Sequence, residues 1–214
     1  IALDTPEDAL KLFTSVKAKS AHGLTTFELM PRMGLDLVTH HIAGTRDPLA
    51  TRTEWIVLME ISSPVVDGAN ANAEALLGEA MESGLVKDAV LASSLDQRDD
   101  FWRIRESLPE AQTREGASIK HDISVPIGDV PTLISRVISD VEKLVPGVRP
   151  VPFGHMGDGN LHFNLQAPVD MDGKAFMAQA DQIHACVYGH VIALDGSVSA
   201  EHGIGQLKRR QLNE

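Results

Sequence analysis

The sequence predicts an α+β fold, in which helices pack on a ferredoxin-like antiparallel sheet. From residue 118 onward, the helix and strand patterns follow the order β-α-β-β-α-β, which is typical of a split βαβ unit. The connections are short, and no repeat or low-complexity linker interrupts the chain. Its 214 residues are 43% hydrophobic and 23% charged, which suits a compact core with a solvated surface. We therefore expect one folded unit over residues 1–214, with residues 1–117 wrapping or extending the sheet.

The N-terminal half alternates between helix and strand patterns. Thr5 is a capping residue and Pro6 suits the first helical position, so a helix is expected from there to Lys19. Apolar periodicity, Ala/Leu/Glu-rich composition and glycine stop signals predict the elements that follow. These are strand Leu24–Met30, helix Gly34–His41, strand Glu54–Ser62, helix Asn70–Ser83, strand Val86–Ala92 and helix Asp96–Arg114.

The C-terminal half carries the ferredoxin-like order. Alternating apolar residues predict strands, and longer apolar stripes predict two helices that cover the sheet. The expected elements are strand 118–125, helix Val130–Val145, strand 148–155, strand 161–166, helix Lys174–Leu194 and strand Ser197–Ala200.

The charge and cysteine content exclude several classes of protein. With 19 Lys and Arg against 30 Asp and Glu, the formal net charge is −11, which disfavours binding to nucleic acid or to an anionic membrane. The single Cys186 excludes a disulfide framework, and no run approaches the roughly 20 apolar residues of a membrane span. We expect a soluble, cytoplasmic protein in which any anionic substrate needs a local basic pocket.

A histidine-containing hairpin is predicted within Pro152–Asn164. Asp158-Gly159 is a strong signal for a two-residue turn, which would place His155 directly opposite His162 on one face of the sheet. Asn164 faces the same way. Two imidazoles at this spacing can share a metal ion, or they can simply stack on a half-buried sheet. The spacing alone leaves both interpretations open.

A second candidate group follows the last predicted strand, in Gly196–Gly205. Glu201 can complete a two-histidine, one-carboxylate metal set, and the adjacent His202 is a candidate base. The alternative role for Glu201 is to cap the helix that follows.

Two basic residues are candidates for a substrate pocket. Arg105 lies one turn past Phe101 and Trp102, near the apolar face of its helix, whereas Arg103 falls on the solvent side. Lys120 lies in an alternating strand, where an outward salt bridge is the usual role of a lysine. A functional role requires Arg105 and Lys120 to converge on the metal.

Two motifs give the chain a family resemblance. Gly154-His-Met-Gly-Asp-Gly-Asn-Leu-His162 and Ser199-Ala-Glu-His-Gly-Ile-Gly205 resemble the C-terminal, substrate-binding domain of FAD-linked oxidases of the vanillyl-alcohol-oxidase type. The resemblance extends over essentially all 214 residues, and it is strongest to the members that oxidise D-2-hydroxyglutarate or D-lactate.

The resemblance implies a function, a set of site residues and two cofactors. It implies a domain of an FAD-dependent D-2-hydroxy-acid dehydrogenase with a divalent metal, expected to be zinc. The metal ligands would be His155, His162 and Glu201, the substrate would contact Arg105, Lys120 and Asn164, and His202 would act as the base. FAD would be held by an N-terminal domain that this chain lacks, either in the same polypeptide or in a separate subunit, and a homodimer is a candidate assembly.

The chain departs from the family pattern at one substrate position. Pro109 stands where related sequences often carry a hydroxyl residue, four positions beyond the substrate arginine. The chain also stops before the expected terminal segment, so we expect an isolated substrate domain that is inactive alone. Two other functions stay open from the sequence: a stand-alone metal-dependent hydrolase, and a non-catalytic ferredoxin-like binding module.

Overall fold

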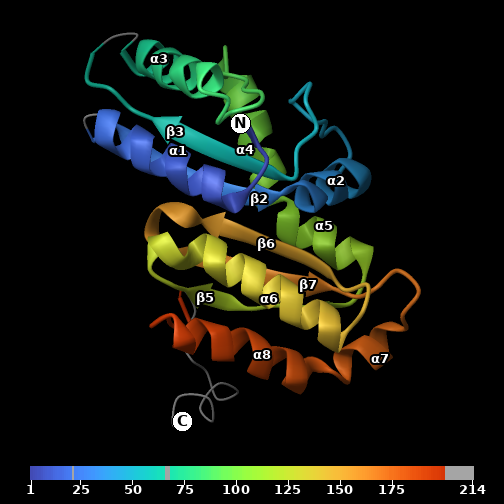
Figure 1. Ribbon diagram of the computed structural model, residues 1–214. Helices are drawn as coiled ribbons and strands as arrows, with labels where there is room; N and C mark the ends of the chain where they lie inside the picture. Colours follow the sequence, from blue (N-terminus) through green and yellow to red (C-terminus); the bar gives the residue numbers. More distant parts are fainter. Residues whose placement is uncertain (21, 66–67, 201–214) are drawn as a thin grey trace.

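A computed structural model describes residues 1–20, 22–65 and 68–200 of the chain (Figure 1). Its helices are α1 (Pro6–Lys19), α2 (Arg32–His41), α3 (Gly68–Glu82), α4 (Leu95–Glu106), α5 (Leu108–Glu115), α6 (Val130–Leu144), α7 (Gly173–Met177) and α8 (Ala180–Ala193). Its strands are β1 (Ala2–Leu3), β2 (Leu24–Pro31), β3 (Trp55–Ile61), β4 (Ser118–Ile119), β5 (Asp122–Ser124), β6 (Arg149–His155) and β7 (Asn160–Gln166). All seven strands belong to one antiparallel sheet, in which β1-β3-β2-β6-β7-β4 are successive neighbours and β5 also pairs with β7. The predicted α+β class is confirmed.

The two halves of the chain repeat one strand order. In the N-terminal half, Asp88 forms an isolated β-bridge with Ala2 of β1. Strand β1 then pairs with β3, and β3 pairs with β2. In the C-terminal half, Ser197 forms an isolated β-bridge with Ser124 of β5. Strand β5 then pairs with β7, and β7 pairs with β6. The halves meet where β2 pairs with β6. The ferredoxin-like order predicted from residue 118 is therefore confirmed, and residues 1–117 extend the sheet with a second unit of the same order, which the sequence did not reveal as a repeat.

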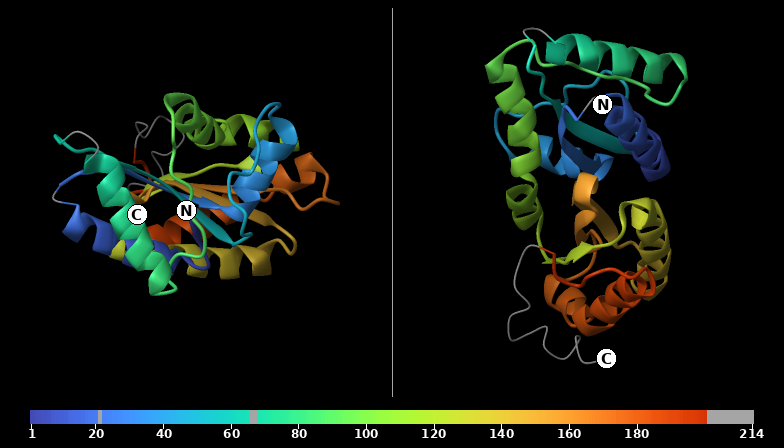
Figure 2. Two further views of the ribbon diagram at one scale, coloured as in Figure 1. Left: turned by 90° about the horizontal axis from the view of Figure 1, so that it is seen from above. Right: turned by 90° about the vertical axis from the view of Figure 1, so that its left-hand side faces the viewer.

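Helices cover both faces of this sheet (Figure 2). One face packs against α1, α6 and α8 around the larger apolar core, which includes Phe163 and Val137. The opposite face packs against α2, α4 and α5 around a smaller core, which includes Phe153 and Leu108. Side chains alternate between the two cores along each strand, so each strand residue belongs to one face.

Two predicted helices are each divided in two. In place of the single helix expected over Asp96–Arg114, α4 ends at Glu106 and α5 begins at Leu108. Pro109 has no backbone N–H to donate, so a continuous helix would lose a hydrogen bond there. The chain instead closes α4 with a bond from the Ser107 N–H to the Arg103 carbonyl oxygen, 3.0 Å long. The helix expected over Lys174–Leu194 is likewise two helices, α7 and α8.

Three predicted strands are shorter than expected. Val86–Ala92 forms only an isolated bridge at Asp88, and Ser197–Ala200 forms one at Ser197. Strand 118–125 is interrupted at Lys120 and His121, which separate β4 from β5. The interruption has a local cause, because the His121 ring nitrogen Nδ1 lies 2.7 Å from the Phe163 carbonyl oxygen. The His121 side chain thus takes the place of a backbone N–H donor in the pairing with β7.

The predicted hairpin lies in the expected place but has a different turn and register. Met156–Asp158 form a 3-10 turn, and Gly159 follows in the left-handed conformation with φ +81°. His162 therefore pairs with Phe153, and the direct pairing of His155 with His162 is wrong. The extra turn residues shift the register by two positions. A two-residue shift keeps alternating side chains on the same face of a regular strand, whereas a one-residue shift would not.

A substitution at Gly159 tests whether this turn determines the geometry of the hairpin. A Cβ at this position would overlap the Val125 carbonyl oxygen, and the positive φ disfavours other residues. We expect Gly159→Ala to lower the free energy of unfolding by at least about 2 kcal/mol in urea denaturation. Gly128→Ala is the control, because a Cβ there meets nothing within 4 Å. Equal effects of the two substitutions would contradict this role of the turn.

Candidate active site

A buried carboxylate occupies the junction between the two halves of the sheet. Glu28 of β2 is opposite His155 of β6, and its side chain is fully buried. One carboxylate oxygen, Oε1, contacts Nδ1 of the His155 ring. The other, Oε2, accepts a 2.6 Å hydrogen bond from Nε of Arg105. Glu28 therefore connects one predicted metal ligand to one predicted substrate residue.

Helix α4 brings Arg105 to this carboxylate. The helix begins at a Ser94 cap, whose side chain accepts from the Gln97 N–H, and Arg105 lies on its buried face. Its guanidinium carbon lies 4.8 Å from the centre of the Phe153 ring, a cation–π arrangement. The residue is only 8% exposed. Its predicted position on the apolar face is confirmed, and Arg103 lies on the exposed side, where it bonds to the Ala43 carbonyl oxygen.

Arg105 holds Glu28 through Nε, one of its three guanidinium nitrogens. Within the described part of the chain, the only hydrogen bond of its guanidinium is the one that Nε donates to Glu28. A charged guanidinium presents its terminal N–H groups as a fork that matches a carboxylate. The buried ion pair thus fixes Arg105 without using the edge that best binds an anion.

Strand β7 supplies His162 and Asn164 to the same side of the sheet. The His162 ring lies against Phe153, with 5.1 Å between ring centres. Asn164 is opposite Val151, which belongs to the smaller core on this face. Its amide Nδ2 donates a 2.9 Å hydrogen bond to Oε1 of Gln112 in α5. Asn164 is thus held in place by a neighbouring helix.

The structure leaves part of the predicted site untested. Lys120 is exposed and lies in the gap between β4 and β5. Glu201 and His202 lie outside the described residues, so their predicted roles stay predictions. Among residues 1–20, 22–65 and 68–200, no three or more His, Cys, Asp or Glu side chains are grouped closely enough to hold a metal ion.

Two residues of the site were not found from the sequence. Glu28 interrupts the apolar run Phe27–Met30 on the inner strand β2, and a charged residue in such a strand is a signal for a buried pair. Gln112 is fully buried in α5 and carries the amide that positions Asn164. No local pattern marks Gln112, because its importance depends on the contact between a helix and a distant strand.

A further histidine pair lies on the opposite face of the sheet. Nδ1 of His184 in α8 is 2.9 Å from Nε2 of His121. The His184 ring stacks on Tyr188, with planes 8° apart. Burial, together with the nearby Asp122 carboxylate, raises the pKa of the Tyr188 hydroxyl. The His121 ring also contacts the Phe163 carbonyl oxygen of β7. The histidine pair therefore connects α8 to β7 at the interruption between β4 and β5.

The candidate site therefore combines groups suited to an anionic substrate and a cation. Arg105 offers a positive charge, Asn164 bonds to Gln112 of α5 on the same side of the sheet, and one ring nitrogen of His155 contacts a carboxylate. Metal-bound histidines are commonly oriented by a carboxylate in this way. A rigid sheet holds all of these groups except Arg105, which α4 supplies.

Sequence comparison places the chain in a family. The family described as "FAD linked oxidases, C-terminal domain" matches residues 1–214, so the chain belongs to it. The Arabidopsis thaliana mitochondrial D-2-hydroxyglutarate dehydrogenase is 32% identical over 202 residues, which are 94% of this chain and 35% of that protein. The D-2-hydroxyglutarate dehydrogenase of Xanthomonas citri pv. viticola is 32% identical over 212 residues, which are 99% of this chain and 44% of that protein.

A third relative differs in its named reaction. The D-2-hydroxyglutarate–pyruvate transhydrogenase of Saccharomyces cerevisiae is 29% identical over 213 residues, covering 95% of this chain and 41% of that protein. The chain thus spans less than half the length of each of these relatives. None of the described helices is long and apolar enough to cross a membrane.

The buried Glu28 carboxylate provides a test of the site's architecture. We expect Glu28→Gln to lower the free energy of unfolding by about 3 kcal/mol in urea denaturation, because it leaves the Arg105 charge buried without its partner. Glu106→Gln, which removes the same charge from an exposed position of α4, is the matched control and should have little effect. If the two variants are equally stable, Glu28 does not hold Arg105 in the way described.

Proposed function

We propose that the chain is the substrate- and metal-binding domain of an FAD-dependent dehydrogenase that oxidises a D-2-hydroxy acid to the 2-oxo acid. The observation that carries the proposal is the buried Glu28 carboxylate, which contacts both His155 and Arg105. His155 belongs to the Gly154–His162 motif of the family resemblance, and Arg105 comes from helix α4. Family membership supports this function over a stand-alone hydrolase or a non-catalytic module.

The described residues suit a divalent metal ion. Metal-bound histidines commonly contact a carboxylate through the ring nitrogen that does not bind the metal. His155 contacts Glu28 through Nδ1, so we propose that a metal would bind through the other ring nitrogen, Nε2. We propose His155, His162 and Glu201 as the ligands, with zinc as the metal.

Different residues would bind the two ends of the substrate. When bound, the metal would lower the pKa of the substrate hydroxyl, as metals do for bound water. Arg105 would hold a carboxylate through its terminal nitrogens, and Asn164 would donate or accept a hydrogen bond beside it. Lys120 would supply a second, solvent-accessible positive charge, and His202 would take the hydroxyl proton.

The proposed reaction requires a partner outside this chain. The family description links this domain to FAD, and a bound flavin would accept the hydride from the substrate. We propose that a flavin domain, in the same polypeptide or in a separate subunit, holds the FAD against the face that carries Arg105 and His162. The role of this chain is then to bind and orient the hydroxy acid and to hold its developing charge.

Zinc binding tests the proposed metal set directly. We expect the purified chain to bind about one equivalent of zinc in a competition titration, since two histidines and a carboxylate make a common metal set. His155→Ala and His162→Ala should each weaken binding by about 100-fold or more. His190→Ala is the control, because His190 pairs with Asp140 on α6, away from this face.

Either of two results would contradict the metal proposal. One is the absence of zinc binding by the unaltered chain. The other is equal zinc affinity in the His155, His162 and His190 variants.

Substrate choice tests the roles of Arg105 and Lys120 in the complete, FAD-containing enzyme. A dicarboxylate such as D-2-hydroxyglutarate can use both cations, whereas D-lactate can use one. We expect Arg105→Ala and Lys120→Ala each to reduce kcat/KM for D-2-hydroxyglutarate by roughly 10- to 100-fold. One of them should leave D-lactate turnover nearly unchanged. Equal losses for both substrates would refute the preference for a dicarboxylate.

A further inference from the structure

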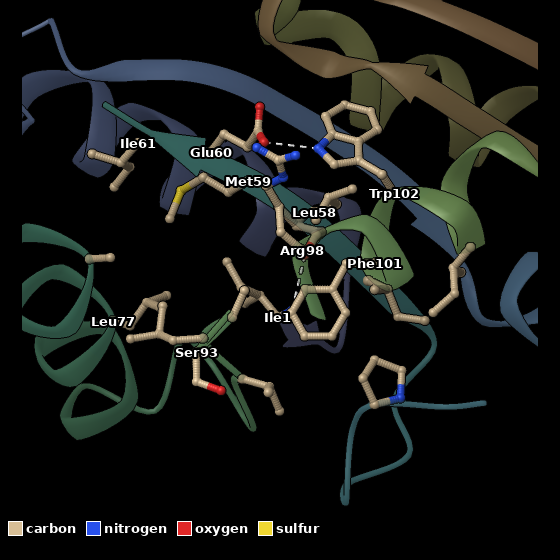
Figure 3. A pocket seen from close by; sticks show the side chains of 18 of the residues that line it. Ile1, Leu58, Met59, Glu60, Ile61, Leu77, Ser93, Arg98, Phe101 and Trp102 are labelled. Carbon is tan, nitrogen blue, oxygen red and sulfur yellow. Dashed lines mark hydrogen bonds between the residues drawn. The ribbon is translucent and has the colours of Figure 1, made fainter. Parts of the chain in front are cut away.

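A large apolar cavity lies beside strand β3, along the part of this strand that β1 does not cover. Its volume is about 640 Å³, and it lies between β3, α3 and α4 (Figure 3). Apolar side chains from these three elements line it, among them Leu58, Met59, Ile61, Leu77 and Phe101. At one end Trp102 donates a 2.9 Å hydrogen bond from Nε1 to the Glu60 carboxylate.

Large apolar side chains at the cavity remain open to water. Leu95, at the start of α4, is 70% exposed, and Leu91 in the preceding loop is 37% exposed. Isolated exposed apolar residues are ordinary, but these two line an apolar cavity. This is the pattern expected where another polypeptide segment packs.

The backbone of β3 is only partly paired along this cavity. Strand β1 pairs with Trp55 and Ile56. Val57 continues this pairing through two hydrogen bonds with Ile1. The Val57 N–H donates to the Ile1 carbonyl oxygen over 2.9 Å, and the Ile1 amino group donates to the Val57 carbonyl oxygen over 3.0 Å. No strand in the described part of the chain pairs with the same edge of β3 from Leu58 to Ile61.

We propose that this edge of β3 binds an extended segment that continues β1 toward the N-terminus, supplied by the residues that precede Ile1 in a longer polypeptide. Family members carry this domain at their C-terminal end, and the relatives compared above are more than twice as long as this chain. The proposal does not use the metal or substrate assignments made above.

The register of β1 fixes where each added residue would lie. If the register of β1 continues, the residue immediately before Ile1 would lie opposite Leu58, and the second residue before Ile1 would lie opposite Met59. Backbone groups alternate along a strand, so the Met59 N–H points to the same edge as that of Val57. The second added residue would therefore exchange two hydrogen bonds with Met59. Side chains of the added residues would enter the cavity from both faces of the strand, because Leu58 and Met59 both line it.

The state of the Ile1 amino group agrees with a strand that runs on. Burial lowers the pKa of this group to about 6, against an ordinary value of 8.0. A peptide bond at this position would satisfy the Val57 carbonyl oxygen without burying a charge. A small apolar ligand could fill the cavity as well, but it would leave the Met59 backbone without a partner.

Hydrogen exchange of the Met59 amide tests the proposal. The chain is compared with one that begins Val-Thr-Val-Thr before Ile1, and with a control that begins Pro-Gly-Pro-Gly. Both extensions remove the charge at Ile1, but proline at the second added position has no N–H to pair with Met59. We expect only the first extension to slow Met59 exchange, by about tenfold or more, with Leu58 unaffected because its N–H points toward β2.

Two results would overturn the proposal. If both extensions change Met59 exchange equally, pairing with added residues is not responsible. If Met59 is protected in the unextended chain and its molecular mass in solution is doubled, a second copy of the chain occupies the edge instead.

Discussion

The buried Glu28 carboxylate is the interaction on which the arrangement of the site depends. A charge with no exposure to water is tolerated only where partners compensate it, and here they are Arg105 and His155. Glu28 lies where β2 meets β6, at the junction of the two halves of the sheet. The same contact therefore joins the halves, fixes α4 against the sheet and orients a histidine. Moving β2 or α4 would separate Glu28 from Arg105 and leave a charge buried without its partner.

The repeated strand order explains why the site lies at this junction. Each half is a sheet with helices on its faces, and neither half alone contains both Glu28 and His155. Helices α4 and α5 connect the halves and carry Arg105 and Gln112 to the face that they cover. Supporting contacts of this kind hold functional groups more precisely than loops do. The same strand order leaves β3 near the outer edge of the sheet, beside the apolar cavity.

The sequence predicted what depends on local patterns and missed what depends on distant contacts. Composition and periodicity predicted the α+β class, and the position of Arg105 on its helix was also predicted correctly. The hairpin register could not be found, because a 3-10 turn and a two-residue turn share the signal Asp158-Gly159. Glu28 and Gln112 were missed because their partners lie far away in the sequence. Glu201 and His202 remain predictions from the family motif.

The orientation of the His155 ring is the most direct test of the central claim, that Glu28 holds this histidine ready for a metal. Nitrogen-15 NMR of the zinc-loaded chain, with labelled histidine, distinguishes the two ring nitrogens of His155. The account predicts a zinc-bound Nε2 and a protonated Nδ1, because Nδ1 contacts the Glu28 carboxylate. Zinc bound through Nδ1, or a His155 signal that zinc leaves unchanged, would contradict it.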